Sequence, residues 1–150
     1  MPTTFARVDE SRLDELLTFV AKYYAFDGIT FDRDAVCRGA RELLANPSLG
    51  GAWLIGDGER FVGHVVVSFS IDLEFGGRQA TIAELYLDEV VRRRGFGTET
   101  LRFAEGMLRE MGIHALELQV EEDNAEARAF YVRNGFESHT RIPLSKRLGG

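Results

Sequence analysis

Residues 79–120 limit the fold more than any other part of the chain, because they read as a strand, a helix and a second strand in succession. Apolar runs predict strands over 79–87 and 114–120, and an apolar stripe predicts a helix over 98–111. Two strands that are joined through a helix lie parallel in one sheet, with a right-handed crossover. The chain is therefore expected to build a sheet that contains a parallel pair of strands.

Tight turns earlier in the chain predict antiparallel pairing as well. Gly56-Asp57-Gly58 joins strands expected over 52–55 and 60–69, and a turn around Gly76-Gly77 leads into the strand over 79–87. The remaining expected elements are a strand over 3–8, helices over 12–24, 32–45 and 125–133, and one or two final strands within 136–148. This order, β-α-α-β-β-β-α-β-α-β, predicts an α/β fold in which helices flank a mixed, mostly antiparallel sheet with a central parallel strand pair.

Length, charge and cysteine content narrow the range of functions. A chain of 150 residues is expected to form a single domain over 1–150. The formal net charge of −6 argues against a nucleic-acid partner, which requires a broad basic face. No charge-free window is long enough for a membrane span, and Cys37 is the only cysteine, which excludes an internal disulfide. We expect a cytoplasmic protein without a membrane or nucleic-acid partner, either a monomer or a homodimer.

A block of arginines and glycines, Arg92 to Thr98, lies between the strand over 79–87 and the helix that follows. The first N–H groups of a helix have no partner within it, and the helix dipole favours an anion there. Glycine lets the backbone approach a ligand, and arginine adds charge-assisted hydrogen bonds to phosphate oxygens. The block predicts a cradle for a pyrophosphate, with a basic turn that only caps the helix as the alternative. Neither a dinucleotide fingerprint nor a P-loop fits these residues.

A second motif follows the strand over 114–120. It reads Asn124-Ala125-x-Ala127-x-x-Phe130-Tyr131-x-x-x-Gly135-Phe136. With both motifs in place, the chain resembles the GCN5-related N-acetyltransferase (GNAT) family over nearly its whole length, and within it the small bacterial members of unassigned substrate. The family pattern Arg/Gln-x-x-Gly-x-Gly/Ala matches Arg92 to Gly97. Glu89 departs from the family, because many members carry proline at that position.

The resemblance implies acetyl-CoA as the acyl donor. In the family, the cradle binds the CoA pyrophosphate, and the strand before it carries a bulge and binds the pantetheine arm through its backbone. Tyr131 matches the usual general acid, which protonates the leaving thiolate; a core aromatic beside Phe130 is the alternative. The cofactor-binding residues implied in this way are Leu85, Tyr86, Leu87, Arg92, Arg93, Arg94, Gly95, Phe96, Gly97, Thr98 and Asn124.

Acyl transfer to an amine also requires a base, because an alkylammonium with a pKa of about 10.4 must lose a proton near neutral pH. Glu84 is the candidate, since it directly precedes the segment expected to bind pantetheine; a solvent-facing glutamate is the alternative. Tyr24, Phe26 and Glu74 are the candidates for binding the acceptor, with core packing as the alternative for the two aromatic residues and a solvated turn charge as the alternative for Glu74. Acidic groups recur in the segments expected near the acceptor, which favours a small primary amine as substrate.

We therefore expect an acetyl-CoA-dependent N-acetyltransferase that modifies a small primary amine by direct attack in a ternary complex. A protein lysine or N-terminal amine is the alternative acceptor, and a catalytically silent acyl-CoA-binding module is the alternative function. No metal site is expected, because the three histidines, His64, His114 and His139, are scattered over predicted strands without ligand spacing.

Overall fold

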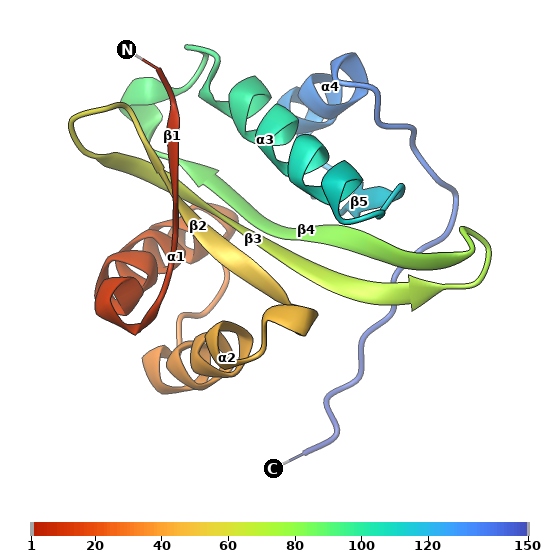
Figure 1. The fold of residues 1–150 in the computed structure, drawn as a ribbon, viewed down its shortest axis with the longest axis horizontal. Coiled ribbons are helices and arrows are strands. Elements are labelled where there is room, and N and C mark those ends of the chain that lie inside the picture. Colours follow the sequence, from red (N-terminus) through yellow and green to blue (C-terminus); the bar gives the residue numbers. More distant parts are fainter. Residues whose placement is uncertain (1, 150) are drawn as a thin grey trace. The chain divides into compact units, whose positions relative to one another are not determined.

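The computed structural model describes residues 2–149, which form two compact units, 2–119 and 120–149. The first unit is built on a five-stranded sheet with the order β1-β2-β3-β4-β5. Its strands are β1 (Thr4–Arg7), β2 (Gly50–Gly56), β3 (Phe61–Asp72), β4 (Gly77–Leu87) and β5 (Leu116–Leu118). Neighbours from β1 to β4 pair antiparallel, and β5 pairs parallel with β4 (Figure 1). The predicted mixed, mostly antiparallel sheet is confirmed.

Helices cover both faces of this sheet. The helices α1 (Leu13–Asp27) and α2 (Arg33–Ala45) lie on one face, and α3 (Phe96–Glu110) lies on the other (Figure 1). Short 3-10 turns are η1 (Glu10–Arg12), η2 (Pro47–Leu49) and η3 (Glu89–Val91). The predicted stripe of α1 is buried in the main apolar cluster through Leu13, Leu16, Leu17 and Val20. The helix continues past its expected end at residue 24, and Gly28 closes it in the left-handed conformation, with φ 70°.

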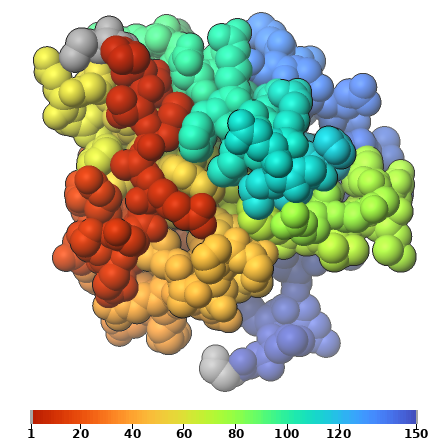
Figure 2. All heavy atoms as spheres, viewed as in Figure 1, coloured from red at the N-terminus to blue at the C-terminus, as the bar shows by residue number. Residues whose placement is uncertain are grey.

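Aromatic side chains pack the face of the sheet that α3 covers. Phe5 of β1 stacks on Phe103 of α3 with ring centroids 4.2 Å apart, and Trp53 of β2 meets the same ring edge-on at 5.8 Å. The atoms of β1 and α3 lie against each other in the space-filling view (Figure 2). Val65 of β3 pairs with Trp53, so Val65 and Val67 also point to the α3 face.

One extra residue in β4, Ala83, changes the face on which the later residues of that strand lie. Val67 pairs with Ile82, but the preceding residue of β3, Val66, pairs with Glu84. Ile82 lies on the α3 face with Val67, and a regular strand would place Glu84 on that face too. The bulge instead turns Glu84 to the face covered by α1. The bulge that the family resemblance implies in this strand is therefore present.

The second unit contains one helix within its described residues, α4 (Ala125–Arg133), and its bounds match the prediction. Asn124 caps this helix, because its Oδ1 accepts a hydrogen bond from the Ala127 amide at 3.1 Å. The capping residue explains why the helix begins where the sequence motif begins.

The final strands expected within 136–148 are wrong, since residues 136–149 contain no strand. Pro143 has no N–H to donate to a ladder, and the apolar side chains beside it, Ile142 and Leu144, are 81% and 93% exposed. A strand needs a partner and a face to bury, and this segment has neither. Among the described strands, the parallel pair therefore lies at the edge of the sheet and not at its centre.

The histidines are also distributed differently from the prediction. His64 lies in β3, as expected, whereas His114 precedes β5 and His139 falls in the irregular segment after α4. Only His64 is fully buried, and it is the histidine that contributes to the site described next.

Candidate active site

Glu84 leaves the bulge of β4 on the α1 face, where it meets a buried histidine. His64 pairs with Tyr86 across the β3–β4 ladder and so lies diagonally opposite Glu84. The distance between His64 Nε2 and Glu84 Oε1 is 2.8 Å, which is a hydrogen bond. His64 is completely buried, whereas the Glu84 side chain keeps 17% of its surface exposed. Glu84 is thus a mostly buried carboxylate that solvent still reaches.

Aromatic rings surround this pair. The centroids of Phe19 and Tyr23, both from α1, lie 6.4 and 6.1 Å from the imidazole, and that of Tyr86 lies 6.4 Å away. Tyr24 comes from the same helix, and its ring meets Phe31 edge-on at 5.9 Å. Because these rings exclude water, they strengthen the electrostatic interactions of the polar groups that they enclose.

The phenol of Tyr24 interacts with the Glu84 carboxylate. Burial, the negative charge of Glu84 and a hydrogen bond to that side chain raise the pKa of Tyr24 to about 12. The phenol therefore stays protonated near neutral pH, where it can donate. The sequence indicated Tyr24 as an acceptor-binding residue and Glu84 as a base on separate grounds, and the structure brings the two together.

The second half of β4 has an unpaired edge on the side of β5. The pairing between these strands covers only residues 80–82 of β4. Beyond the bulge, the Asp88 amide donates to the Val62 carbonyl of β3 at 2.8 Å. Backbone amides alternate in direction along a strand, so the amides of Leu85 and Leu87 point away from β3. No strand within residues 2–149 pairs with that edge after residue 82.

The predicted phosphate cradle is a sharp turn between η3 and α3. Arg93 has φ 66° and Gly95 has φ 91°, so two of its residues are left-handed. That conformation is uncommon for a residue with a side chain, and such strain concentrates at ligand sites. Gly95 is also the N-cap of α3 and offers no side-chain acceptor. The amides of the first turn, including those of Gly97 and Thr98, therefore have no acceptor within the helix.

Arg92, which opens this turn, connects it to the α1 face. Its Nε donates to the Leu87 carbonyl at 2.9 Å. Its guanidinium lies 4.5 Å from the ring centroid of Phe26 and 5.4 Å from that of Tyr86. These contacts place Phe26, an expected acceptor-binding residue, beside the start of the cradle. Arg94, by contrast, is exposed.

Asn124 and Tyr131 belong to the second unit. The Tyr131 ring lies beside Phe130 and Phe136, with centroids 5.2 and 5.6 Å away. The side-chain oxygen of Asn124 is engaged as the cap of α4. The roles of Asn124 toward CoA and of Tyr131 as general acid stay predictions.

Glu74 is not brought to the rest of the predicted site. It lies in the turn after β3, where Asp72 pairs with Gly77, and its amide donates to Asp72 Oδ1 at 2.9 Å. Glu84 lies toward the other end of the same hairpin, beyond the bulge. Glu74 therefore belongs to a solvated turn, and we leave it out of the proposed site.

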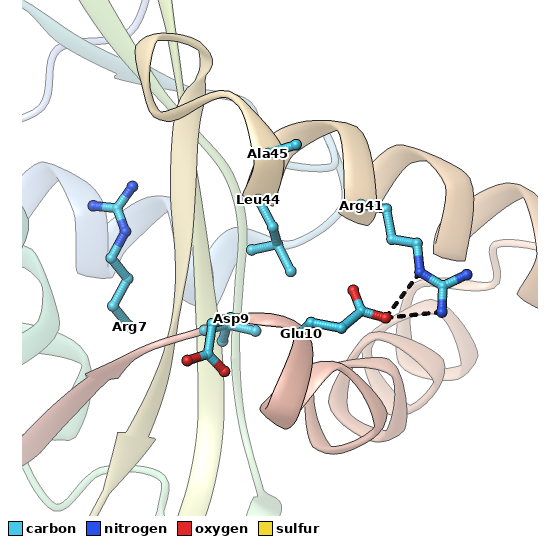
Figure 3. A pocket seen from close by; sticks show the side chains of 7 residues that line it. Arg7, Asp9, Glu10, Arg41, Leu44 and Ala45 are labelled. Atoms are coloured by element: carbon cyan, nitrogen blue, oxygen red, sulfur yellow. Dashed lines mark hydrogen bonds and ion pairs between the residues drawn. The ribbon is translucent and has the colours of Figure 1, made fainter.

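A hollow of about 430 Å³ lies elsewhere in the first unit, between the end of β1, η1 and the end of α2. Arg41 and Glu10 reach toward each other there, with Nη2 and Oε1 2.9 Å apart, and Arg7 extends away from them (Figure 3). The basic and acidic side chains that line the hollow neutralise one another, and none of the predicted site residues lines it. The hollow is thus separate from the cluster around Glu84.

Within residues 2–149, no helix is long and apolar enough to cross a membrane. The same residues contain no group of three or more His, Cys, Asp or Glu side chains that is arranged to hold a metal ion.

The comparison with protein families agrees with the motifs. The model of the acetyltransferase (GNAT) family matches residues 14–136, which include the bulged strand, the cradle and α4. The chain belongs to the GNAT acetyltransferase family. Acyl transfer from acetyl-CoA is the general activity of this family, and the family resemblance seen in the sequence is confirmed. None of the curated proteins matches the chain.

Solved structures share the GNAT fold. An integron cassette protein from the mobile metagenome of Cole Harbour Salt Marsh is 25% identical, with a TM-score of 0.85 over 97% of this chain and 91% of that chain. A predicted acetyltransferase with acetyl-CoA from Clostridium acetobutylicum is 18% identical, with a TM-score of 0.81 over 97% and 96%. An aminoglycoside antibiotic 6'-N-acetyltransferase from Acinetobacter baumannii is 16% identical, with a TM-score of 0.79 over 99% and 100%. At these two lower identities the likeness shows the fold alone.

His64 is the residue of this GNAT site that the sequence did not identify. In a regular hairpin, the turn at 73–76 would pair His64 with Leu85, so that His64 and Glu84 would point to opposite faces. The extra residue at Ala83 brings them to the same face. The signal was available, because the family resemblance already implied a bulge in this strand.

Proposed function

We propose that this GNAT chain transfers an acetyl group from acetyl-CoA to a small primary amine by direct attack in a ternary complex. One observation carries the proposal: the carboxylate of Glu84 is held on β4 directly beside the unpaired half of that strand. A base and a backbone edge that can hold an extended ligand are thus supplied by consecutive residues. This is the juxtaposition that acyl transfer to an amine requires.

The donor would bind to two elements of the first unit. The backbone of Leu85 and Leu87 would pair with the amide groups of the pantetheine arm, much as a missing strand would. The turn from Arg93 to Thr98 would hold the pyrophosphate through the first amides of α3, with positive charge from Arg93 and Arg94. The tight backbone conformations at Arg93 and Gly95 support this assignment. Asn124, from the second unit, would be a further CoA-binding residue.

The chemistry follows from the groups named. Removing a proton from an ammonium with a pKa of about 10.4 costs about 4.6 kcal/mol at pH 7, and the Glu84 carboxylate would accept that proton. The neutral nitrogen then attacks the thioester carbonyl, while the amide of Leu85 or Leu87 donates to the oxyanion. A C–N bond forms and the C–S bond breaks. Tyr131 would protonate the leaving thiolate and recover a proton as the nitrogen loses its second one.

The acceptor would lie on the α1 face. Tyr24 and Phe26 offer aromatic surfaces there, and Glu84 offers a negative charge, a combination that suits an alkylammonium group. A protein lysine or N-terminus stays as the alternative acceptor, and a silent acyl-CoA-binding module as the alternative function.

Calorimetric titration with acetyl-CoA tests the donor site, and turnover with a panel of amines tests the reaction. Gly97→Glu places a bulky negative side chain in the first turn of α3 and should abolish binding. Gly106→Glu is the matched control, because it lies in the same helix at an exposed position with open space around it, and it should bind as the unaltered protein does. Equal affinity of the two variants would refute the cradle. Tight binding without turnover of any amine would favour the silent module.

A further inference from the structure

A histidine at position 64 carries a cost in folding free energy. It is completely buried, and its Nδ1 has no hydrogen-bond partner among the described residues. Buried polar atoms in native proteins are nearly always paired, so each exception calls for an explanation. Its cross-strand partner in β2 is Leu54, and a leucine would also suit the apolar surroundings of position 64. Packing alone therefore does not account for the histidine.

The hydrogen-bond pattern defines the form of the ring. If the imidazole is neutral and carries its proton on Nε2, it donates to Glu84 Oε1, and Nδ1 is left with only a lone pair. If the ring were cationic, an Nδ1–H donor would be buried without an acceptor, which is less favourable than a bare lone pair. A protonated Glu84 that donated from Oε1 to Nε2 would likewise force the proton of the ring onto Nδ1. The geometry thus favours a neutral donor facing an ionised carboxylate.

The charged and titratable groups around the pair come from two elements besides β3. From α1, Tyr23 meets the imidazole, Tyr24 meets Glu84, and Lys22 is 3.2 Å from Asp88 in an ion pair of its own. From the end of β4, Tyr86 meets the imidazole, and the guanidinium of Arg92 lies over the same Tyr86 ring. Among the described residues, none of these groups apart from Glu84 is a carboxylate that faces His64, and the imidazole makes its hydrogen bond to Glu84.

We infer that His64 is a positioning residue that fixes the Glu84 carboxylate toward the unpaired edge of β4 and keeps it ionised as the proton acceptor. The inference rests on the proposed function, in which Glu84 accepts a proton from the amine. His64 does not touch the substrate itself, because it is completely buried. It acts through its Nε2–H, and a residue without a donor at that point would leave Glu84 both mobile and easier to protonate.

Three variants separate this role from packing. His64→Leu removes the donor, His64→Gln keeps an amide donor near the position of Nε2, and His64→Asn holds its donor further back. For His64→Leu we expect the acid limb of the kcat/KM profile to move to higher pH, since a hydrogen bond to the charged form favours that form. kcat should fall more than KM rises. His64→Gln should restore the profile, and His64→Asn should not.

The thermal stability of the variants distinguishes this positioning role from a purely structural one. Because His64→Leu removes both the unpaired Nδ1 and the donor to Glu84, which are opposing effects on stability, its melting temperature should change little. A loss of activity that only follows a loss of stability would overturn the inference. If His64→Leu fails to fold, the Gln and Asn pair still decides, because both keep a polar side chain and differ in the reach of the donor.

A direct titration separates this inference from the proposed function. The ¹³C carboxyl resonance of Glu84, assigned by its disappearance in Glu84→Gln, reports protonation of that side chain without any turnover. We expect its titration midpoint to move to higher pH in His64→Leu and to return in His64→Gln. An unchanged midpoint would overturn the role of His64, whatever the activity. Absence of turnover in the unaltered protein, with the midpoint shifted as expected, would overturn only the proposed function.

Discussion

The two halves of β4 have the same neighbour on one side and different surroundings on the other. Over residues 80–82 the strand lies between β3 and β5, and its backbone is occupied on both edges. From Glu84 onward β3 continues as a neighbour, but the pairing with β5 has ended. A single extra residue, Ala83, divides the two halves. One half therefore stabilises the sheet, and the other leaves backbone groups and a carboxylate available for a ligand.

A change of one residue in the backbone register of β4 is enough to create the site. Without the bulge, Glu84 would lie on the face packed by α3, where apolar residues such as Leu101 and Ala104 are buried. With it, Glu84 lies among His64, Tyr24 and the other rings contributed by α1. The polar cluster depends on the bulge as much as on the identity of its residues.

The strongest effect on activity should come from replacing Glu84, which lies beside the unpaired half of β4. Glu84→Gln should lower kcat/KM at pH 7 by about 10²- to 10⁴-fold, because it removes the proton acceptor. The loss should diminish at high pH, where the amine loses its proton without help. Glu117→Gln is the matched control, since Glu117 of β5 is exposed and pairs with Thr81, where β4 has a neighbouring strand on both edges. Steady-state kinetics across pH would refute the role of Glu84 if the loss were uniform or if both variants behaved alike.

A smaller effect should come from two glycines that pair with opposite ends of the hairpin. A Cβ at Gly63, which pairs with Leu87, would collide with the Tyr86 carbonyl oxygen, whereas a Cβ at Gly77 meets nothing within 4 Å. Gly63→Ala should therefore lower the free energy of unfolding by about 1–3 kcal/mol. Gly77→Ala should leave it unchanged. Urea denaturation measures both, and equal stability of the two variants would show that β3 and β4 are not tightly apposed beyond the bulge.

The smallest effect concerns pH. The pKa of Tyr24 is about 12 in the folded protein, against an ordinary value of 10.0. Between these values the unfolded chain has released the proton that the folded protein keeps, so stability falls as pH rises from about 10 to 12. Tyr24→Phe should flatten this part of the melting-temperature profile, and Glu84→Gln should move the Tyr24 titration, followed by tyrosinate absorbance, toward its ordinary value. An unchanged alkaline profile in Tyr24→Phe would contradict the contact.

The sequence predicted the elements of this fold well where local signals were strong. The helix over 125–133 was placed to the residue, because Asn124 supplies a cap that the sequence displays. The one or two final strands expected within 136–148 were wrong, because local sequence does not show whether a partner strand exists, and Pro143 cannot donate to a ladder. For the site, Glu84 and Tyr24 were identified by chemistry and family resemblance. Their contact, and the part played by His64, depend on the register after Ala83, which composition and periodicity do not reveal.

Amide hydrogen exchange, followed residue by residue by NMR, tests whether the second half of β4 binds the acyl donor. Without ligand, the Ala80 amide, which donates to Ala115 at 2.9 Å, should exchange slowly, and the amides of Leu85 and Leu87 should exchange quickly. Saturating acetyl-CoA should slow Leu85 and Leu87 strongly and change Ala80 little, because the pantetheine arm then takes the place of a strand along that edge. Protection that appears elsewhere, with Leu85 and Leu87 unchanged, would contradict the assignment of the second half of β4 as the donor site.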